Sequence, residues 1–168
     1  MTTPQPPGTT RHASDGAPAR VLVVAGTAEG RNTLRRHVQQ EGYVVDTAGQ
    51  GGEALEKLRA EPCDVVLLDV PMPGTDGPRF LAALRNDARL AQVPVIVVSA
   101  PDDIDALEQC LELGADDYLP KAFRPAMLRT RLSAALDRGR LRDAESLTRE
   151  MAVARSIQRD FLPESLPL

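Results

Sequence analysis

The stretch VVLLDVPMPG, residues 65–74, decides how this chain folds. Four apolar residues run without a break into an acid, Asp69, and Pro71, Pro73 and Gly74 then prevent any regular element from continuing. A continuous apolar run of this length is typical of a strand that is buried on both faces. An ionised carboxylate at the tip of such a strand is costly to desolvate. We therefore take Asp69 as the first candidate for a functional residue.

Other short β-branched runs predict further strands, so that the full set covers residues 20–25, 43–48, 63–69, 93–99 and 116–120. Helical patterns lie between these runs. One of them ends at Gly42, and a later one, which contains Ile104, Cys110 and Leu111, ends at Gly114. Repeated alternation of strand and helix predicts a doubly wound α/β domain with right-handed crossovers.

Composition excludes several classes of function. The chain has 168 residues, 42% of them hydrophobic and only 3% aromatic, so we expect an aliphatic core. Its formal net charge of −4 gives no reason to expect a nucleic-acid partner, and no apolar run approaches the ~20 residues of a membrane span. Cys63 and Cys110 lack metal-like spacing and are interpreted as isolated thiols. We expect a soluble, cytoplasmic protein without a membrane partner.

The chain divides into three parts. Residues 1–19 are rich in Pro, Thr, Gly and Ser and are predicted to be a disordered tail. Residues 20–138 form the α/β domain, and residues 139–168 form a helical linker that continues a helical pattern starting near residue 124. Gly139 is the weak point of that pattern, at about 1 kcal/mol relative to Ala.

A short heptad-like seam follows Gly139, with Leu147, Met151, Ala154 and Phe161 at spacings of three, four or seven. Two interpretations remain open. The helix either packs back on its own domain or pairs with a partner helix in a homodimer. We favour pairing, because a helix beyond the fifth strand has little of the domain left to cover.

The strand ends indicate where the site lies. In an open parallel sheet, ligands bind beyond the carboxyl ends of the strands. Those ends carry Ala25 and Gly26, Asp69, Ser99 and, shortly after the fifth strand, Lys121. A carboxylate can act as a nucleophile toward phosphorus, and a phosphoryl group then needs a hydroxyl donor and a fixed cation. The Gly-rich stretch at residues 26–30 lacks the lysine of a P-loop, which argues against nucleotide binding.

Together, the segments RVLVVA, DVVLLDVPMPGTDG, VPVIVVSA and GADDYLPKAF resemble the receiver domain of two-component response regulators. The resemblance covers residues 20–138 and implies a flavodoxin-like, five-stranded parallel sheet in the order 2-1-3-4-5, here followed by an extended C-terminal helix. It implies that Asp69 is the phosphoacceptor, Ser99 the switch hydroxyl and Lys121 the lysine that pairs with phosphate. Tyr118 is then the aromatic residue that follows the state of the switch, and Gly77 closes the loop after the acceptor.

The same family usually places two acids after the first strand, where they hold Mg²⁺ with the acceptor and the carbonyl two residues beyond it. Here those positions are Ala25 and Gly26, which leaves Asp69 and the Pro71 carbonyl. Glu29 follows but is expected to point off the first helical turn. Mg²⁺ needs a near-octahedral shell of oxygen ligands. We therefore expect weak or absent Mg²⁺ binding, no other cofactor, and poor modification by small phosphodonors.

The tail segment ARSIQRDFLPESLP resembles the helical connector ahead of serine phosphatase domains of the RsbU and SpoIIE type, members of the PP2C class. It implies a regulatory module, not itself an enzyme, that controls an attached phosphatase through a dimeric linker, with a histidine kinase or other regulatory protein as partner. The alternative is a stand-alone, protein-binding pseudo-receiver. On the first interpretation the chain is a fragment of a longer regulator.

Overall fold

The computed structural model describes residues 18–70 and 76–141. The strands are β1 (Arg20–Val24), β2 (Val44–Ala48), β3 (Val65–Val70), β4 (Val95–Ser99) and β5 (Asp117–Pro120). The helices are α1 (Ala28–Gln40), α2 (Gly51–Ala60), α3 (Asp76–Asn86) and α4 (Ile104–Glu112), and the described chain ends in a further helix over residues 125–141. All strand pairs are parallel and the sheet has the order β2-β1-β3-β4-β5. The predicted doubly wound fold, its strand order and its C-terminal helix are confirmed.

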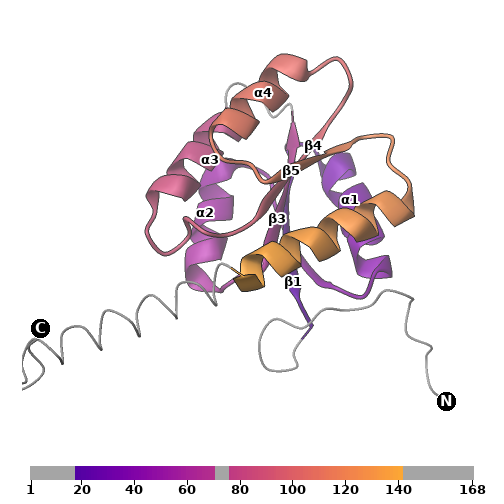
Figure 1. Cartoon of the computed structure of the whole chain (residues 1–168), viewed down its shortest axis with the longest axis horizontal. Coiled ribbons are helices and arrows are strands. Elements are labelled where there is room, and N and C mark those ends of the chain that lie inside the picture. Colours follow the sequence, from indigo (N-terminus) through magenta and orange to yellow (C-terminus); the bar gives the residue numbers. More distant parts are fainter. Residues whose placement is uncertain (1–17, 71–75, 142–168) are drawn as a thin grey trace, which may run out of the picture.

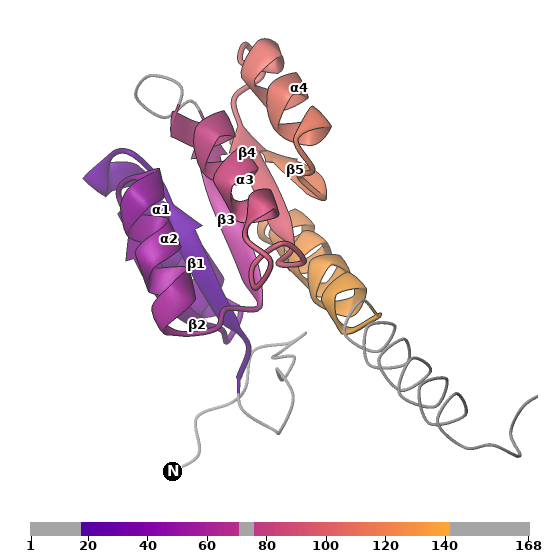
Figure 2. The ribbon, with the colours of Figure 1, turned by 90° about the vertical axis from the view of Figure 1, so that its left-hand side faces the viewer.

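The sheet lies between two layers of helices, with α2, α3 and α4 on one face and α1 and the 125–141 helix on the other (Figure 1). Figure 2 shows the same arrangement after a quarter turn. Each face has its own core, because successive residues of a strand point to opposite sides. In β1, Leu22 and Val24 belong to the α2–α4 core, whereas Val21 and Val23 belong to the core under α1. Burial on both faces explains why the strands read as unbroken apolar runs.

Strand register brings the functional positions to one edge of the sheet. Asp69 lies opposite Val98, and Val70 lies opposite Ser99. Ser99 in turn lies opposite Pro120, one residue before Lys121. The carboxyl ends of β3, β4 and β5 therefore place their chemistry at the same level of the sheet.

Two residues at the predicted boundaries of the domain are held close to it in the structure. Ala19, assigned to the tail, is fully buried, and its carbonyl accepts a hydrogen bond of 3.0 Å from the Val44 amide, because pairing with the neighbouring strand begins one residue early. Gly139, the first residue of the predicted linker, lies inside the 125–141 helix. A Cβ there would stand 3.3 Å from Cγ of Pro94, so the glycine permits a close approach of the helix to the sheet.

Helix α4 is the exception to the buried apolar pattern. Cys110 is fully buried, but Ile104 is 56% exposed and Leu111 is 41% exposed. Tyr118 in the adjacent strand β5 is 43% exposed. Ile104 and Leu111 have the spacing of a buried helix face, but their side chains lie on the outer surface. The nine-residue helix α4 packs only part of its circumference on the domain, on the side of Cys110.

The two cysteines are free thiols. Cys63 donates hydrogen bonds from Sγ to the carbonyl of Val65 at 3.0 Å and that of Arg20 at 3.3 Å. Burial raises the pKa of its thiol to about 12, so little of the reactive thiolate forms near neutral pH. In the described part of the chain, no helix has the length and apolar character needed to cross a membrane.

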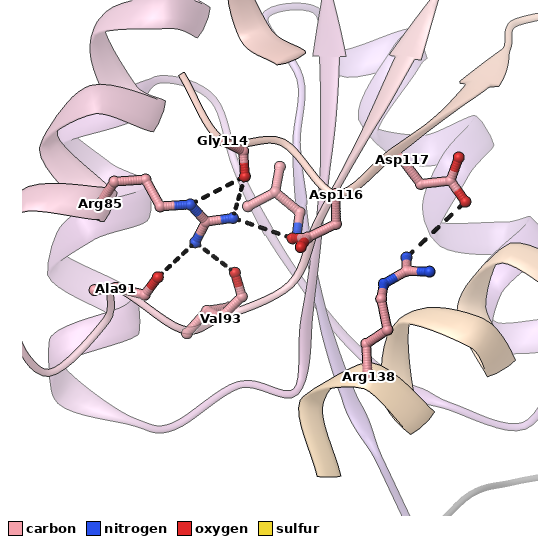
Figure 3. A network of polar contacts seen from close by, with 8 residues as sticks. Arg85, Ala91, Val93, Gly114, Asp116, Asp117 and Arg138 are labelled. Carbon is pink, nitrogen blue, oxygen red and sulfur yellow. Dashed lines mark hydrogen bonds and ion pairs between the residues drawn. The ribbon is translucent and has the colours of Figure 1, made fainter. Parts of the chain in front are cut away.

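A half-buried arginine connects several segments at the opposite edge of the sheet (Figure 3). Arg85 of α3 donates to the carbonyls of Ala91, Val93 and Gly114 and forms an ion pair of 3.1 Å with Asp116. The same Asp116 oxygen accepts the Val95 amide at 2.8 Å. Gly114 has a φ of +106°, and a Cβ on it would stand 3.0 Å from the guanidinium of Arg85, so glycine serves both the turn and the contact.

We predict that Arg85→Ala lowers the free energy of unfolding by about 3 kcal/mol, because it leaves the Asp116 carboxylate buried without its cation. That side chain is only 6% exposed. Urea denaturation of purified variants measures the loss. Arg89→Ala is the matched control, since Arg89 is exposed and its removal is expected to change stability by no more than about 0.5 kcal/mol. A loss below about 1 kcal/mol for Arg85→Ala would contradict the assigned role of the network.

Candidate functional site

Asp69 is the fifth residue of β3 and faces the α1 side of the sheet, following the alternation set by Leu67. Its side chain is only 13% exposed. Oδ1 lies 3.0 Å from Nζ of Lys121, and no other donor among the described residues reaches that buried oxygen. Sequence analysis predicted that these two side chains meet, and the structure brings them together.

Lys121 is held in place by β4. Its backbone amide donates to the carbonyl of Ser99 at 3.0 Å, directly after the register pair of Ser99 with Pro120. The ammonium therefore reaches Asp69 from a fixed backbone position, while its side chain keeps 39% of its surface in solvent. The ammonium thus combines a fixed backbone position with a side chain that remains in contact with solvent.

Burial raises the pKa of Asp69 above the usual range, and this desolvation outweighs the hydrogen bond and charge of Lys121, which lower it. Asp103, at the start of α4, adds a small repulsion that raises it further. The carboxylate is thus held in a place where its ionised form is incompletely compensated.

Ser99 and Tyr118 lie near the pair but do not contact it. Ser99 is 3% exposed, and its hydroxyl donates to the carbonyl of Ala100 at 3.1 Å. Tyr118 points outward from β5, with 43% of its surface exposed. The predicted site residues therefore share one edge of the sheet, with Asp69 and Lys121 in direct contact and the hydroxyl turned to its own backbone.

The predicted acid positions, Ala25 and Gly26, lie at the carboxyl end of β1 and supply no side-chain oxygen. Arg31 of α1 instead donates to the carbonyl of Ala25 at 2.9 Å. No three His, Cys, Asp or Glu side chains of residues 18–70 and 76–141 gather closely enough to hold a metal ion. Pro71, whose carbonyl was a candidate ligand, lies outside the described residues. The described residues thus do not match the oxygen-rich shell that Mg²⁺ requires.

Sequence analysis missed Gly30, which stands in the first turn of α1. Its amide donates to Oγ1 of Thr27, the N-cap residue, at 3.0 Å. A Cβ on Gly30 would lie 3.2 Å from Oδ2 of Asp69 and 3.0 Å from that hydroxyl. The only signal in the sequence was a glycine inside a helical pattern, where it costs about 1 kcal/mol and so calls for a structural reason.

Gly30 opens a hollow of about 280 Å³ beside Asp69. It runs between α1 and the segment after β5. The lining residues are Thr27, Glu29, Gly30, Thr33, Leu34, Asp69, Val98, Lys121 and Phe123. The Asp69 carboxylate and the Lys121 ammonium form a polar end, and Leu34, Val98 and Phe123 supply the apolar wall.

Gly77 belongs to α3, not to the loop before it. It is the second residue of that helix and is buried. A Cβ there would lie 3.1 Å from Cγ1 of Val70. The glycine therefore lets the start of α3 approach the end of β3, the strand that carries Asp69.

Comparison with known proteins defines the class. Residues 21–133 match the model of the response regulator receiver domain family, and the chain belongs to that family. Two curated relatives are the response regulator MprA of Mycobacterium ulcerans and the probable transcriptional regulator ycf27 of Guillardia theta. MprA is 39% identical over 76% of this chain and 54% of its own length. The second protein is 40% identical over 71% of this chain and 46% of its own length. The chain thus spans about half the length of these relatives.

Solved structures agree. The chemotaxis protein CheY4 of Vibrio cholerae is 30% identical, with a TM-score of 0.64 over 70% of this chain and 98% of that chain. NtrX of Brucella abortus is 25% identical, with a TM-score of 0.69 over 76% of this chain and 29% of that one. The receiver is thus a whole molecule in one of these proteins and a part of a longer chain in the other. Family membership makes this chain a regulatory receiver module of a two-component system.

We predict that Asp69→Asn raises the free energy of unfolding at pH 7. A raised carboxyl pKa in the folded state means that the ionised form costs stability above that pKa, and the cost disappears as pH falls below the ordinary value near 3.8. The gain should therefore be full near neutrality and shrink toward pH 4. Urea denaturation across this range measures it.

Asp87→Asn is the control of opposite sign. The Arg89 amide and the Arg59 side chain lower the pKa of Asp87, so its ionised form stabilises the fold above the ordinary pKa, and the variant should lose stability at pH 7. That loss should also fade as pH falls. A destabilised Asp69→Asn protein at pH 7 would mean that the Lys121 contact outweighs burial.

Proposed function

We propose that this chain is the receiver of a response regulator in which Asp69 is the potential phosphoacceptor and control passes through the C-terminal helix to a PP2C-type phosphatase effector. The observation that supports it is the 3.0 Å pair of Asp69 and Lys121 at the carboxyl edge of β3, beside Ser99. A histidine kinase or another regulatory protein is the expected partner. The phosphatase assignment rests on the segment ARSIQRDFLPESLP, which lies outside the described residues.

The chemistry of phosphoryl transfer favours weak or phosphorylation-independent use of Asp69. Charge develops on the phosphoryl oxygens during transfer, and a bound cation normally offsets it. Ala25 and Gly26 offer no ligand for such an ion, and Lys121 contributes one charge that Asp69 already uses. We propose that the Asp69–Lys121 pair is a stable resting state and that Mg²⁺ binds weakly or not at all.

A stand-alone pseudo-receiver that acts by binding a protein is the second candidate. The exposed apolar side chains of Ile104, Leu111 and Tyr118 favour it, because they lie on α4 and β5 without cover from the described chain. On this alternative, Asp69 need not be modified for the module to work. Phosphorylation and partner binding are therefore measured separately.

We predict that acetyl phosphate with Mg²⁺ modifies the protein slowly. Intact-mass analysis, with Asp69→Ala as the blank, measures the rate. The Ala25→Asp, Gly26→Asp double variant restores the two acids and should accelerate modification at least about a hundredfold, now dependent on Mg²⁺. Rapid modification of the unaltered protein, lost in Asp69→Ala, would overturn the claim that the absent acids limit the reaction.

We predict a parallel dimer through the C-terminal helix, with Leu147, Met151, Ala154 and Phe161 at its seam; these four residues lie outside the described part of the structure. Sedimentation should find the full chain dimeric at tens of micromolar and a chain cut after Arg138 monomeric. The cut leaves the core intact, because Leu136 is the last buried residue of the described helix.

A double change, Leu147→Asp with Met151→Asp, should separate the dimer without unfolding the receiver. If the cut chain and the full chain associate equally, the dimer interface lies on the receiver and not on the C-terminal helix. Unfolding of the α/β domain by the double change would instead mean that the helix packs back on its own domain.

A further inference from the structure

The hollow beside Asp69 presents more negative than positive charge. Asp69 and Glu29 contribute two carboxylates, and Lys121 is the single cation in the lining. Lys121 meets only Oδ1 of Asp69. Glu29 is exposed in the first turn of α1 and forms no ion pair with any described residue. The Gly30 amide is not free for an anion, because it already donates to the Thr27 hydroxyl.

Oδ1 of Asp69 is buried, whereas 13% of the side chain remains exposed. Gly30 leaves space beside the other oxygen, since a Cβ on it would stand 3.2 Å from Oδ2. The wall beyond it is apolar, with Leu34 of α1 and Val98 of β4 buried and Phe123 half-buried. Phe123 is fixed by an edge contact with His37, with ring centroids 5.1 Å apart. A ligand for this space needs a cationic head, an apolar stem and a face that packs on an aromatic ring.

We propose that the hollow receives an arginine side chain from a protein partner. Its guanidinium bridges Oδ2 of Asp69 and the Glu29 carboxylate. It supplies in trans the positive charge that a metal ion would bring if two acids stood at positions 25 and 26. Guanidinium suits the site better than ammonium, since it is planar, weakly hydrated and able to pair with two carboxylates while it packs on Phe123. Gly30 is the positioning residue, because any side chain there fills the entry to Oδ2. The proposal rests on Asp69 being the functional centre.

The binding step is tested without any phosphodonor, so its outcome is independent of whether Asp69 is ever phosphorylated. The probe is N-acetyl-arginine methylamide, which presents the side chain as a protein does, and its neutral isostere is N-acetyl-citrulline methylamide. Each is titrated into the ¹⁵N-labelled full chain while the amides of Gly30, Leu34 and Phe123 are followed. The arginine probe should saturate in the millimolar range, and the affinity of the citrulline probe should be lower by at least about fivefold.

Variants locate the site. Gly30→Leu should abolish the shifts, whereas Gly52→Leu should leave them intact. Gly52 is also in the first turn of a helix, but a Cβ on it meets nothing within 4 Å. Glu29→Gln, an exposed change that leaves the fold unaffected, should weaken binding about threefold. If Gly30→Leu proves unstable to urea, Gly30→Ala replaces that variant, and Glu29→Gln still tests the site independently.

Three results would overturn the proposal. Equal binding of arginine and citrulline probes would mean that the hollow selects apolar groups only. Unchanged binding in both Gly30→Leu and Glu29→Gln would place the probe elsewhere. Tighter binding of N-acetyl-lysine methylamide than of the arginine probe would assign the hollow to an ammonium group. If the arginine probe binds in the hollow, it should also accelerate modification of Asp69 by acetyl phosphate severalfold. Binding without acceleration would support the binding site but argue against Asp69 phosphorylation as part of the proposed function.

Discussion

The carboxylate of Asp69, near the carboxyl end of the buried strand β3, determines which side chains are needed at this edge of the sheet. β3 is buried on both faces, so the charge cannot turn to solvent, and its side chain is 13% exposed. One ammonium, from Lys121, meets one of its oxygens. Burial nonetheless outweighs that contact and raises the carboxyl pKa. The surroundings leave the second oxygen accessible, since Gly30 withholds a side chain from it.

At the opposite edge of the sheet, the buried carboxylate of Asp116 has a fuller set of partners than Asp69. The Asp116 side chain is even more buried than that of Asp69, with 6% against 13% exposed. One of its oxygens meets both Arg85 and the Val95 amide, and Arg85 also donates to three carbonyls. Buried charges are stabilising only when their partners are complete. The Arg85 network meets this condition and the Asp69 site does not. An incompletely satisfied group that persists in a cleft is a marker of function, because structural demands alone would favour replacing it.

Strand positions, their order and the meeting of Asp69 with Lys121 could be predicted from sequence because continuous apolar runs and strand-end residues report burial and edge directly. Gly30 and the hollow could not, since they depend on how closely α1 approaches β3, and a single glycine carries no distance. The Arg85 network escaped for the same reason, as its partners are backbone carbonyls from two separate loops. Ile104 and Leu111 share the spacing of buried residues, but spacing cannot say how much of α4 the sheet covers. Ala19 and Gly139 show that boundaries follow pairing and packing that composition does not record.

Lys121 links the acceptor to the helix that leaves the domain. Its amide binds Ser99, its ammonium binds Asp69, and Phe123, two residues on, contacts His37 of α1. Arg129 of the following helix binds Glu41 at the end of α1 at 2.8 Å, and Arg138 lies 3.9 Å from Asp117 of β5. An event that draws Lys121 from Asp69 therefore acts where this helix begins. We propose that a rotation at the start of this helix is carried along it, since the helix runs unbroken across Gly139 to residue 141 and packed helices shift between discrete arrangements. Gly139 lies where this helix passes close to Pro94, since a Cβ on it would stand 3.3 Å from Cγ of that proline, so a side chain there would have to displace the helix or the proline.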